Sequence, residues 1–100
     1  MKRRTVAFSP ASNGDLLRLY EWIADGGSEA VAKEYTDRIV AWCMDLDLAS
    51  ERGQRRDDLR KGLRIAGFER RVTIAFTVEE SRVTILRVFY GGQDWESMLS

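Results

Sequence analysis

The sequence contains no histidine, one cysteine and one proline among its 100 residues. Without histidine the chain has no imidazole for acid–base chemistry and no zinc site of the usual kind, so we expect neither a metal nor a cofactor. The single cysteine, Cys43, cannot form an intramolecular disulfide and is typical of a reducing compartment. Because Cys43 lies on an apolar helical stripe, we expect it to be a small core residue rather than a nucleophile.

Long hydrophobic runs are also missing. The basic start, "MKRRTVAFSP", has no apolar stretch long enough for a signal peptide, and no run approaches the roughly 20 residues of a membrane span. We therefore expect a soluble, cytoplasmic protein without membrane contact. A chain of 100 residues that is 44% hydrophobic predicts a single domain over residues 1–100, with one modest core.

The net charge is zero, but the charges are unevenly distributed. Residues 10–51 carry three basic and nine acidic side chains, whereas residues 52–78 carry eight basic and three acidic ones. A neutral total argues against avid, sequence-independent nucleic-acid binding, which depends on many phosphate contacts. The segments 52–56 and 69–71 are either salt-bridged solvated loops or a local basic patch. The adjacent "RRDD" favours the loop, because it carries its own counterions.

The first half of the chain predicts a strand followed by two helices. Residues 5–9 favour a short strand, and Ser9-Pro10 is a helix start with serine as the N-cap. "DGG" at 25–27 ends that helix, and Ser28 caps a second one that extends to Glu51. The two helices should form an antiparallel hairpin. The apolar stripe expected to face the core from the second helix is Val31, Tyr35, Ile39, Trp42, Leu46 and Ala49.

The second half of the chain changes to a period of two. After the charged segment 52–62, residues 62–68, 72–78 and 82–90 predict three strands, and residues 94–99 favour one helical turn. The order β-α-α-β-β-β predicts an α+β fold, in which the helical hairpin packs on one face of a small, mainly antiparallel sheet of about four strands. No other element is available for the second face, so we expect it to be open.

An arginine interrupts the last predicted strand, "TILRVFYGG". Strict alternation places Ile85, Arg87 and Phe89 on one face, and Leu86, Val88 and Tyr90 on the other. On an open face the Arg87 guanidinium could hold an acidic partner or a phosphate. The alternative is an ion pair within the chain, with an acidic residue such as Glu69 or Asp94.

The segment after that strand leaves further alternatives open. Gly91-Gly92 is expected to end the strand, because it lacks the strand-to-helix context of a phosphate-binding loop. Trp95 and Met98 are apolar residues in a polar tail. They either fold back onto the core or form part of a partner surface.

Several segments together resemble the RelE/ParE superfamily of bacterial toxins, with the closer resemblance to the ParE branch. They are "FSPASNGDLLRLYEWIA", "GQRRDDLRKGLRIAGFERRVTIAFTV" and "VTILRVFYGGQD", and the resemblance extends from about Val6 to Asp94. It implies a type II toxin that a cognate antitoxin holds in an inactive heteromer. RelE-type members cut mRNA in the ribosomal A site, whereas ParE-type members poison DNA gyrase without demonstrated nuclease chemistry as a group.

The residues present favour gyrase inhibition by protein binding over an endonuclease. RNA cleavage needs a base, an acid and a cation, but Tyr90 falls where many relatives have histidine, and Gln93 falls where arginine is common. If the chain is a ribosome-dependent mRNA endonuclease, the resemblance makes Arg64, Arg71, Arg87 and Tyr90 the catalytic candidates. Otherwise these four residues and Trp95 form the partner or toxicity surface. We expect no sequence-specific nucleic-acid binding, and the departure at Gln93 is consistent with a weakly toxic member.

Overall fold

The computed structural model describes residues 3–91 and 94–99. The elements follow in chain order as β1 (Thr5–Phe8), α1 (Pro10–Asp25), α2 (Glu29–Met44), the 3-10 helix η1 (Asp45–Asp47), β2 (Gln54–Arg55), β3 (Leu63–Phe68), β4 (Val72–Val78), β5 (Arg82–Tyr90) and α3 (Trp95–Leu99). The predicted α+β order is confirmed, with the two-residue strand β2 added inside the charged segment. Within the described ranges, no helix is long and apolar enough to span a bilayer.

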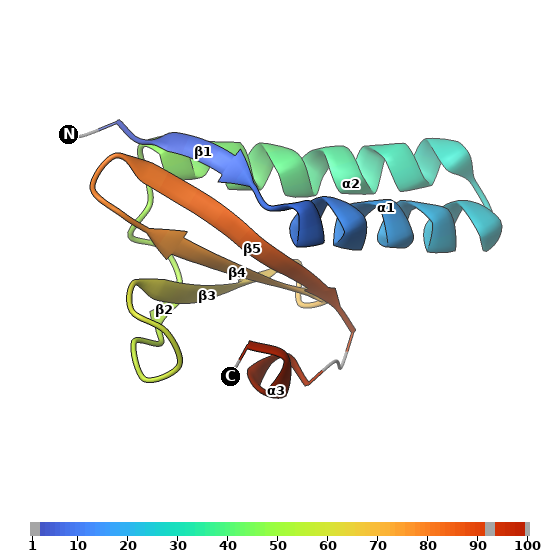
Figure 1. Ribbon diagram of the computed structural model, residues 1–100. Helices are drawn as coiled ribbons and strands as arrows, with labels where there is room; N and C mark the ends of the chain where they lie inside the picture. Colours follow the sequence, from blue (N-terminus) through green and yellow to red (C-terminus); the bar gives the residue numbers. More distant parts are fainter. Residues whose placement is uncertain (1–2, 92–93, 100) are drawn as a thin grey trace.

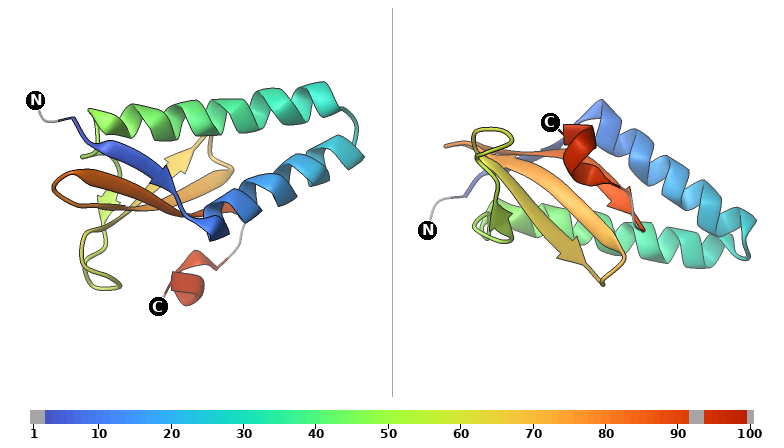
Figure 2. Two further views of the ribbon diagram at one scale, coloured as in Figure 1. Left: turned by 45° about the horizontal axis from the view of Figure 1, so that its top comes forward. Right: turned by 90° about the horizontal axis from the view of Figure 1, so that it is seen from below.

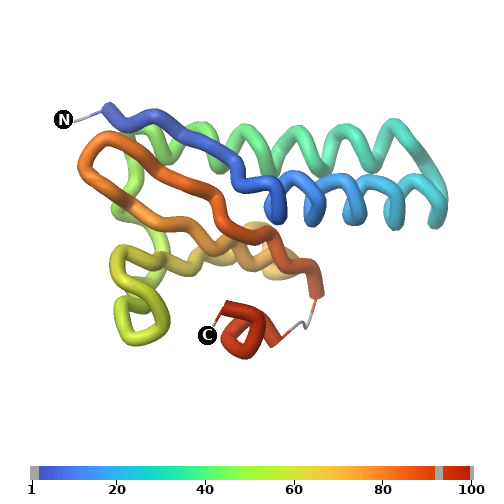
Figure 3. Tube along the Cα trace, in the orientation of Figure 1, coloured from blue at the N-terminus to red at the C-terminus, as the bar shows by residue number. Residues whose placement is uncertain are grey.

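The five strands form one mixed sheet in the order β1-β5-β4-β3-β2. β1 runs parallel to β5, and the other neighbours are antiparallel, so the sheet is mainly antiparallel as expected. The strand at the start of the chain therefore lies beside the last strand, and the helical hairpin follows directly from it (Figures 1 and 3).

Both long helices begin at the predicted serines. The Ser9 hydroxyl accepts a hydrogen bond from the Ser12 N–H at 3.0 Å, with Pro10 in the first helical turn. The Ser28 hydroxyl accepts from the Val31 N–H at 3.2 Å. Each cap satisfies a backbone donor that the first turn leaves without an intrahelical partner.

The first face of the sheet, as we call the face covered by α1 and α2, carries the larger apolar core. Ile39 and Cys43 of α2 and Ile74 and Phe76 of β4 are completely buried there. Trp42 stacks edge-on against Phe76, with ring centroids 6.3 Å apart. Burial also raises the pKa of the Cys43 thiol to about 12. The prediction that Cys43 is a core residue is thus confirmed.

The core-facing stripe of α2 differs from the predicted one at its start. Val31 is 57% exposed, and the neighbouring Ala32 and Thr36 are buried instead. The predicted stripe followed the largest apolar residues, but the helix turns its small side chains inward. Tyr35 and Trp42 are only partly buried and reach the sheet from the flank of the helix.

The second face of the sheet is partly covered, so the expectation of an open face is wrong there. A smaller cluster of Leu63, Ala75 and Phe89 lies on this side, and Trp95 and Leu99 of α3 pack against it. Figures 1 and 2 show α3 on the side of the sheet away from α2. The tail therefore folds back onto the protein as one short helix, which was one of the two predicted alternatives.

A β-bulge in β5 changes which residues share a face. Phe76 of β4 pairs with Ile85, and the next residue, Ala75, pairs with Arg87, so Leu86 is an extra residue in β5. Ile85 packs in the core of the first face, whereas Leu86 packs on the second. The predicted faces of Ile85 and Leu86 are therefore wrong, because the bulge breaks the period of two.

Candidate functional site: a groove between α1 and β5

Arg87 is held by Asp15, a residue 72 positions away in the sequence. The Arg87 Nε and Nη2 atoms donate to the two carboxylate oxygens of Asp15 at 2.8 and 2.9 Å. The alternative of an ion pair within the chain is therefore observed, but neither suggested partner takes part. Glu69 instead pairs with Arg38, and Asp94 accepts from the Ser97 hydroxyl.

Asp15 lies just beyond the point where the edge strand β1 ends. β1 ends beside Ile85, and Ser9 extends the edge by donating its N–H to Ile85 and its hydroxyl to the carbonyl of Leu86. Helix α1 then replaces the strand along the rest of β5. The Asp15 carboxylate accepts the Val88 N–H at 2.9 Å. A side chain thus satisfies a buried backbone donor that a neighbouring strand would otherwise bind.

One carboxylate and two guanidinium groups meet at this point. Arg18 donates to Asp15 at 2.7 Å, so Asp15 joins Arg18 and Arg87, and the three side chains carry one net positive charge. Burial by itself would raise the pKa of Asp15, but hydrogen bonds from Arg87 and Val88 and the charge of Arg87 outweigh it, so the pKa lies below its usual value. The hydrogen bond to Asp15 raises the pKa of Arg87, which therefore stays charged.

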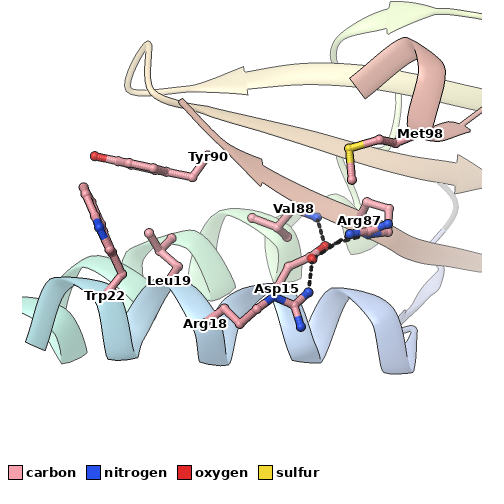
Figure 4. Close-up of a pocket in the computed structure, with 8 residues that line it drawn as sticks. All are labelled: Asp15, Arg18, Leu19, Trp22, Arg87, Val88, Tyr90 and Met98. Atoms are coloured by element: carbon pink, nitrogen blue, oxygen red, sulfur yellow. Dashed lines mark hydrogen bonds and ion pairs between the residues drawn. The ribbon is translucent and has the colours of Figure 1, made fainter. Parts of the chain in front are cut away.

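A groove of about 440 Å³ opens beside this cluster (Figure 4). Its lining comes from α1, β5 and α3 and consists of Asp15, Arg18, Leu19, Trp22, Arg87, Val88, Tyr90 and Met98. The rings of Trp22 and Tyr90 are 5.1 Å apart and tilted by 53°. Trp22 remains 61% exposed and Met98 45% exposed. The groove thus combines accessible apolar walls with a cationic end.

Of the predicted site residues, Arg87 and Tyr90 line the groove together. Arg64 lies on β3 beside a separate charged hollow. Arg71 lies beyond the other end of β3, in the turn to β4, where its carbonyl accepts the Gly91 N–H. Trp95 packs on the second face, and the guanidinium carbon of Arg56 lies over its ring, 5.3 Å from the ring centroid.

Two predicted features fall outside the described residues. They are Gln93, which departs from the family pattern, and Gly92 of the expected strand terminator. Gly91 is described and has a φ of 73°, a conformation that favours glycine at the end of β5.

Three residues of the groove were not predicted from the sequence: Asp15, Arg18 and Trp22. Their spacing of three and four residues places them on one side of α1. This side flanks the apolar stripe of Leu16, Leu19 and Ile23 that packs on the core. Trp22 lies beside this apolar stripe and not within it. That position was the signal in the sequence that a second side of α1 has a function.

Comparisons with known proteins agree on one family. Residues 6–95 match the model of the family described as the ParE toxin of the type II toxin–antitoxin system, parDE. A solved structure of the chromosomal ParDE system from P. aeruginosa is similar, with a TM-score of 0.76 and 20% identity over 89% of this chain and 97% of that chain. The toxin–antitoxin complex RelBE2 from Mycobacterium tuberculosis gives a TM-score of 0.63 and 20% identity over 93% and 97%. A search among curated proteins found no match.

Proposed function

Because the chain belongs to the family of ParE toxins of type II toxin–antitoxin systems, we propose that it inhibits DNA gyrase through protein–protein contact and that a cognate antitoxin neutralises it. The proposed action takes place in the cytoplasm. The alternative function is a ribosome-dependent mRNA endonuclease of the RelE type. The main observation in favour of gyrase inhibition is that the candidate nuclease residues do not meet at one centre: Arg64 lies at the opposite end of the strands from Arg71 and Tyr90.

Cleavage through a 2′-hydroxyl requires an acid, a base and a cation within hydrogen-bonding reach of one phosphate. Arg64 lies near the start of β3 and Arg71 lies beyond its end, and the four residue steps from Arg64 to Phe68 alone span about 13 Å of strand. Arg87 is bound to Asp15, and Tyr90 lies against Trp22. This dispersed arrangement supports a binding function over phosphoryl chemistry at a single centre.

The groove also has the composition of a protein-binding surface. Trp, Tyr and Arg are the side-chain types that most often dominate the energy of protein interfaces. Trp22, Tyr90 and Arg18 line one groove, and both Trp22 and Arg18 are largely exposed. An exposed tryptophan in a small domain is well placed to bury apolar area against a partner protein.

Purified protein, tested in two assays, separates the two functions. We expect inhibition of DNA supercoiling by gyrase, and no cleavage of ribosome-bound mRNA at matching concentrations. Mixing the toxin with the antitoxin encoded beside it should restore supercoiling. Codon-positioned cuts in mRNA, together with unaffected gyrase, would establish the endonuclease, with Arg64, Arg71, Arg87 and Tyr90 as the residues to substitute first.

Expression in cells gives an independent test. Without antitoxin, the toxin should slow growth and produce filamentous cells with DNA-damage signalling, because trapped gyrase breaks DNA. Co-expression of the neighbouring antitoxin frame should relieve both effects. An immediate stop in translation that precedes any DNA damage would contradict gyrase as the target.

A further inference from the structure

We propose that the groove between α1 and β5 binds a helical segment of the antitoxin that carries an apolar side chain and, one helical turn away, a carboxylate. This inference rests on the proposed function, since the antitoxin supplies the segment. It assigns Trp22 as the apolar contact and Arg18 as the residue that selects the acidic group.

The apolar part of the groove is built to receive a large side chain. Leu19 and Val88 are buried at its base, and the exposed Trp22 and Met98 stand at its sides (Figure 4). Its volume of about 440 Å³ lies within the usual range for sites that enclose a ligand group. Filling this space with a leucine or aromatic side chain would remove the exposed apolar surface of Trp22 from water.

The cationic end of the groove can bind one further anion. The Asp15 carboxylate is almost fully buried, with its side chain 7% exposed, and already accepts four hydrogen bonds, from Arg18, Arg87 and Val88. The Arg18 side chain is 68% exposed. Its one hydrogen bond within the described part of the chain uses Nη2, so other N–H groups of the guanidinium face solvent. A second carboxylate can therefore bind the positive charge that Asp15 leaves uncompensated.

The spacing of the two contacts defines the ligand. Arg18 and Trp22 are four residues apart on α1, and side chains at this spacing are neighbours on a helix surface. A partner helix lying along α1 must present its apolar side chain and its carboxylate at a similar separation, three or four residues apart. A nucleic acid fits less well, because the aliphatic base of the groove is unsuited to a sugar–phosphate chain and the cluster carries only one net charge.

Isothermal titration calorimetry of the full toxin with the antitoxin from the neighbouring frame tests the proposal. Trp22→Ala should weaken binding by about 30-fold or more, which is the range of an interface hot spot. Arg18→Gln should weaken it about three- to tenfold and reduce its dependence on salt, as expected for a partly exposed charge pair. Thermal melting of each free variant checks that the substituted chain is folded.

Two matched controls lie outside the groove. Val31→Ala removes an exposed apolar side chain from α2, and Arg55→Gln removes an arginine that is likewise paired with an aspartate. Both should leave the affinity unchanged. In the antitoxin, each acidic residue is neutralised in turn. One of these substitutions should weaken binding to the wild-type toxin and have no further effect on binding to the Arg18→Gln toxin.

The outcomes distinguish a wrong groove assignment from a wrong proposed function. If wild-type toxin binds the antitoxin tightly while Trp22→Ala and Arg18→Gln bind equally well, the groove assignment is wrong and the toxin–antitoxin function stands. If no complex forms with wild type, the proposed function itself fails. Binding of a fluorescent dT12 oligonucleotide that is lost in Trp22→Ala would overturn the proposal in favour of a nucleic-acid site.

Discussion

The two faces of the sheet are held in different ways. On the first face, two sixteen-residue helices enclose a core in which Ile39, Ile74 and Phe76 are completely buried. On the second face, the five-residue α3 rests on a smaller cluster and keeps its place partly through charged contacts. Arg56 lies over the ring of Trp95 and pairs with Glu96 at 3.2 Å.

The two faces of the sheet therefore differ in how much they stabilise the fold and in how accessible they are. Burial of apolar area is the main stabilising term in a small domain, so the first face should supply most of the free energy of unfolding. The second face gains less from its short helix, because a helix of this length has little stability of its own. The groove lies where the two layers meet, since its lining includes α1 from one layer and Met98 of α3 from the other.

The largest effect should come from the core of the first face. Phe76→Ala removes a completely buried ring that contacts Trp42, and should lower the free energy of unfolding by about 3–5 kcal/mol. Ile39→Ala, on α2, should cost about 2–5 kcal/mol. Urea unfolding measures both. A loss below 1 kcal/mol at either position would contradict the assignment of the main core to this face.

The next effect concerns the pair that joins the two layers. Arg87 lies over Phe89 of the second face at 5.1 Å and is bound to Asp15 of α1. Asp15→Asn weakens charge-assisted hydrogen bonds at a buried position, and should cost about 1–3 kcal/mol at pH 7. Asp37→Asn, in an exposed ion pair with Lys33, is the control and should have little effect.

The same carboxylate predicts a pH dependence. Its pKa is lower in the folded protein than the unfolded value of about 3.9. The resulting stabilisation is complete above that value and is lost as the pH falls through the folded pKa. The difference between wild type and Asp15→Asn should therefore be constant near neutrality and shrink below about pH 4. A difference that persists unchanged at low pH would mean that the charge of Asp15 is not responsible.

A smaller effect is expected on the second face. Trp95→Ala removes a half-buried ring from α3 and should cost about 1–2 kcal/mol, less than Phe76→Ala, because part of the ring is already in contact with water. Protease cleavage near the C-terminus should increase in this variant before global unfolding begins. Equal losses for Trp95→Ala and Phe76→Ala would show that the two faces are equally important for stability.

The smallest effect should follow from the charged contacts of α3. Arg56→Gln removes the ion pairs with Asp58 and Glu96, whose side chains are exposed, and the contact with Trp95. We expect a smaller loss of stability than for Trp95→Ala, and one that diminishes at high salt. Parallel urea titrations of the two variants in low and high salt provide the comparison.

Sequence reasoning predicted the fold better than the candidate site. The serine caps, the helical hairpin and the alternating strands follow from short-range patterns and are observed, although the second long helix ends at Met44 and not at Glu51 as expected. Of the predicted site residues, Arg87 and Tyr90 line the groove. Arg64, Arg71 and Trp95 lie elsewhere, because strand direction and the return of the tail separate residues that a family pattern treats as one set.

The sequence by itself determined the order of the elements, the helix starts at Ser9 and Ser28, and the burial of Cys43. These features depend on residues within a few positions of one another, where capping and hydrophobic periodicity act. Only the tertiary structure decided the bulge at Leu86 and the pairing of Asp15 with Arg87 across 72 positions. The physical reason is that β1 ends before β5 does, so helix α1 must satisfy the remaining edge, and no local pattern encodes that meeting.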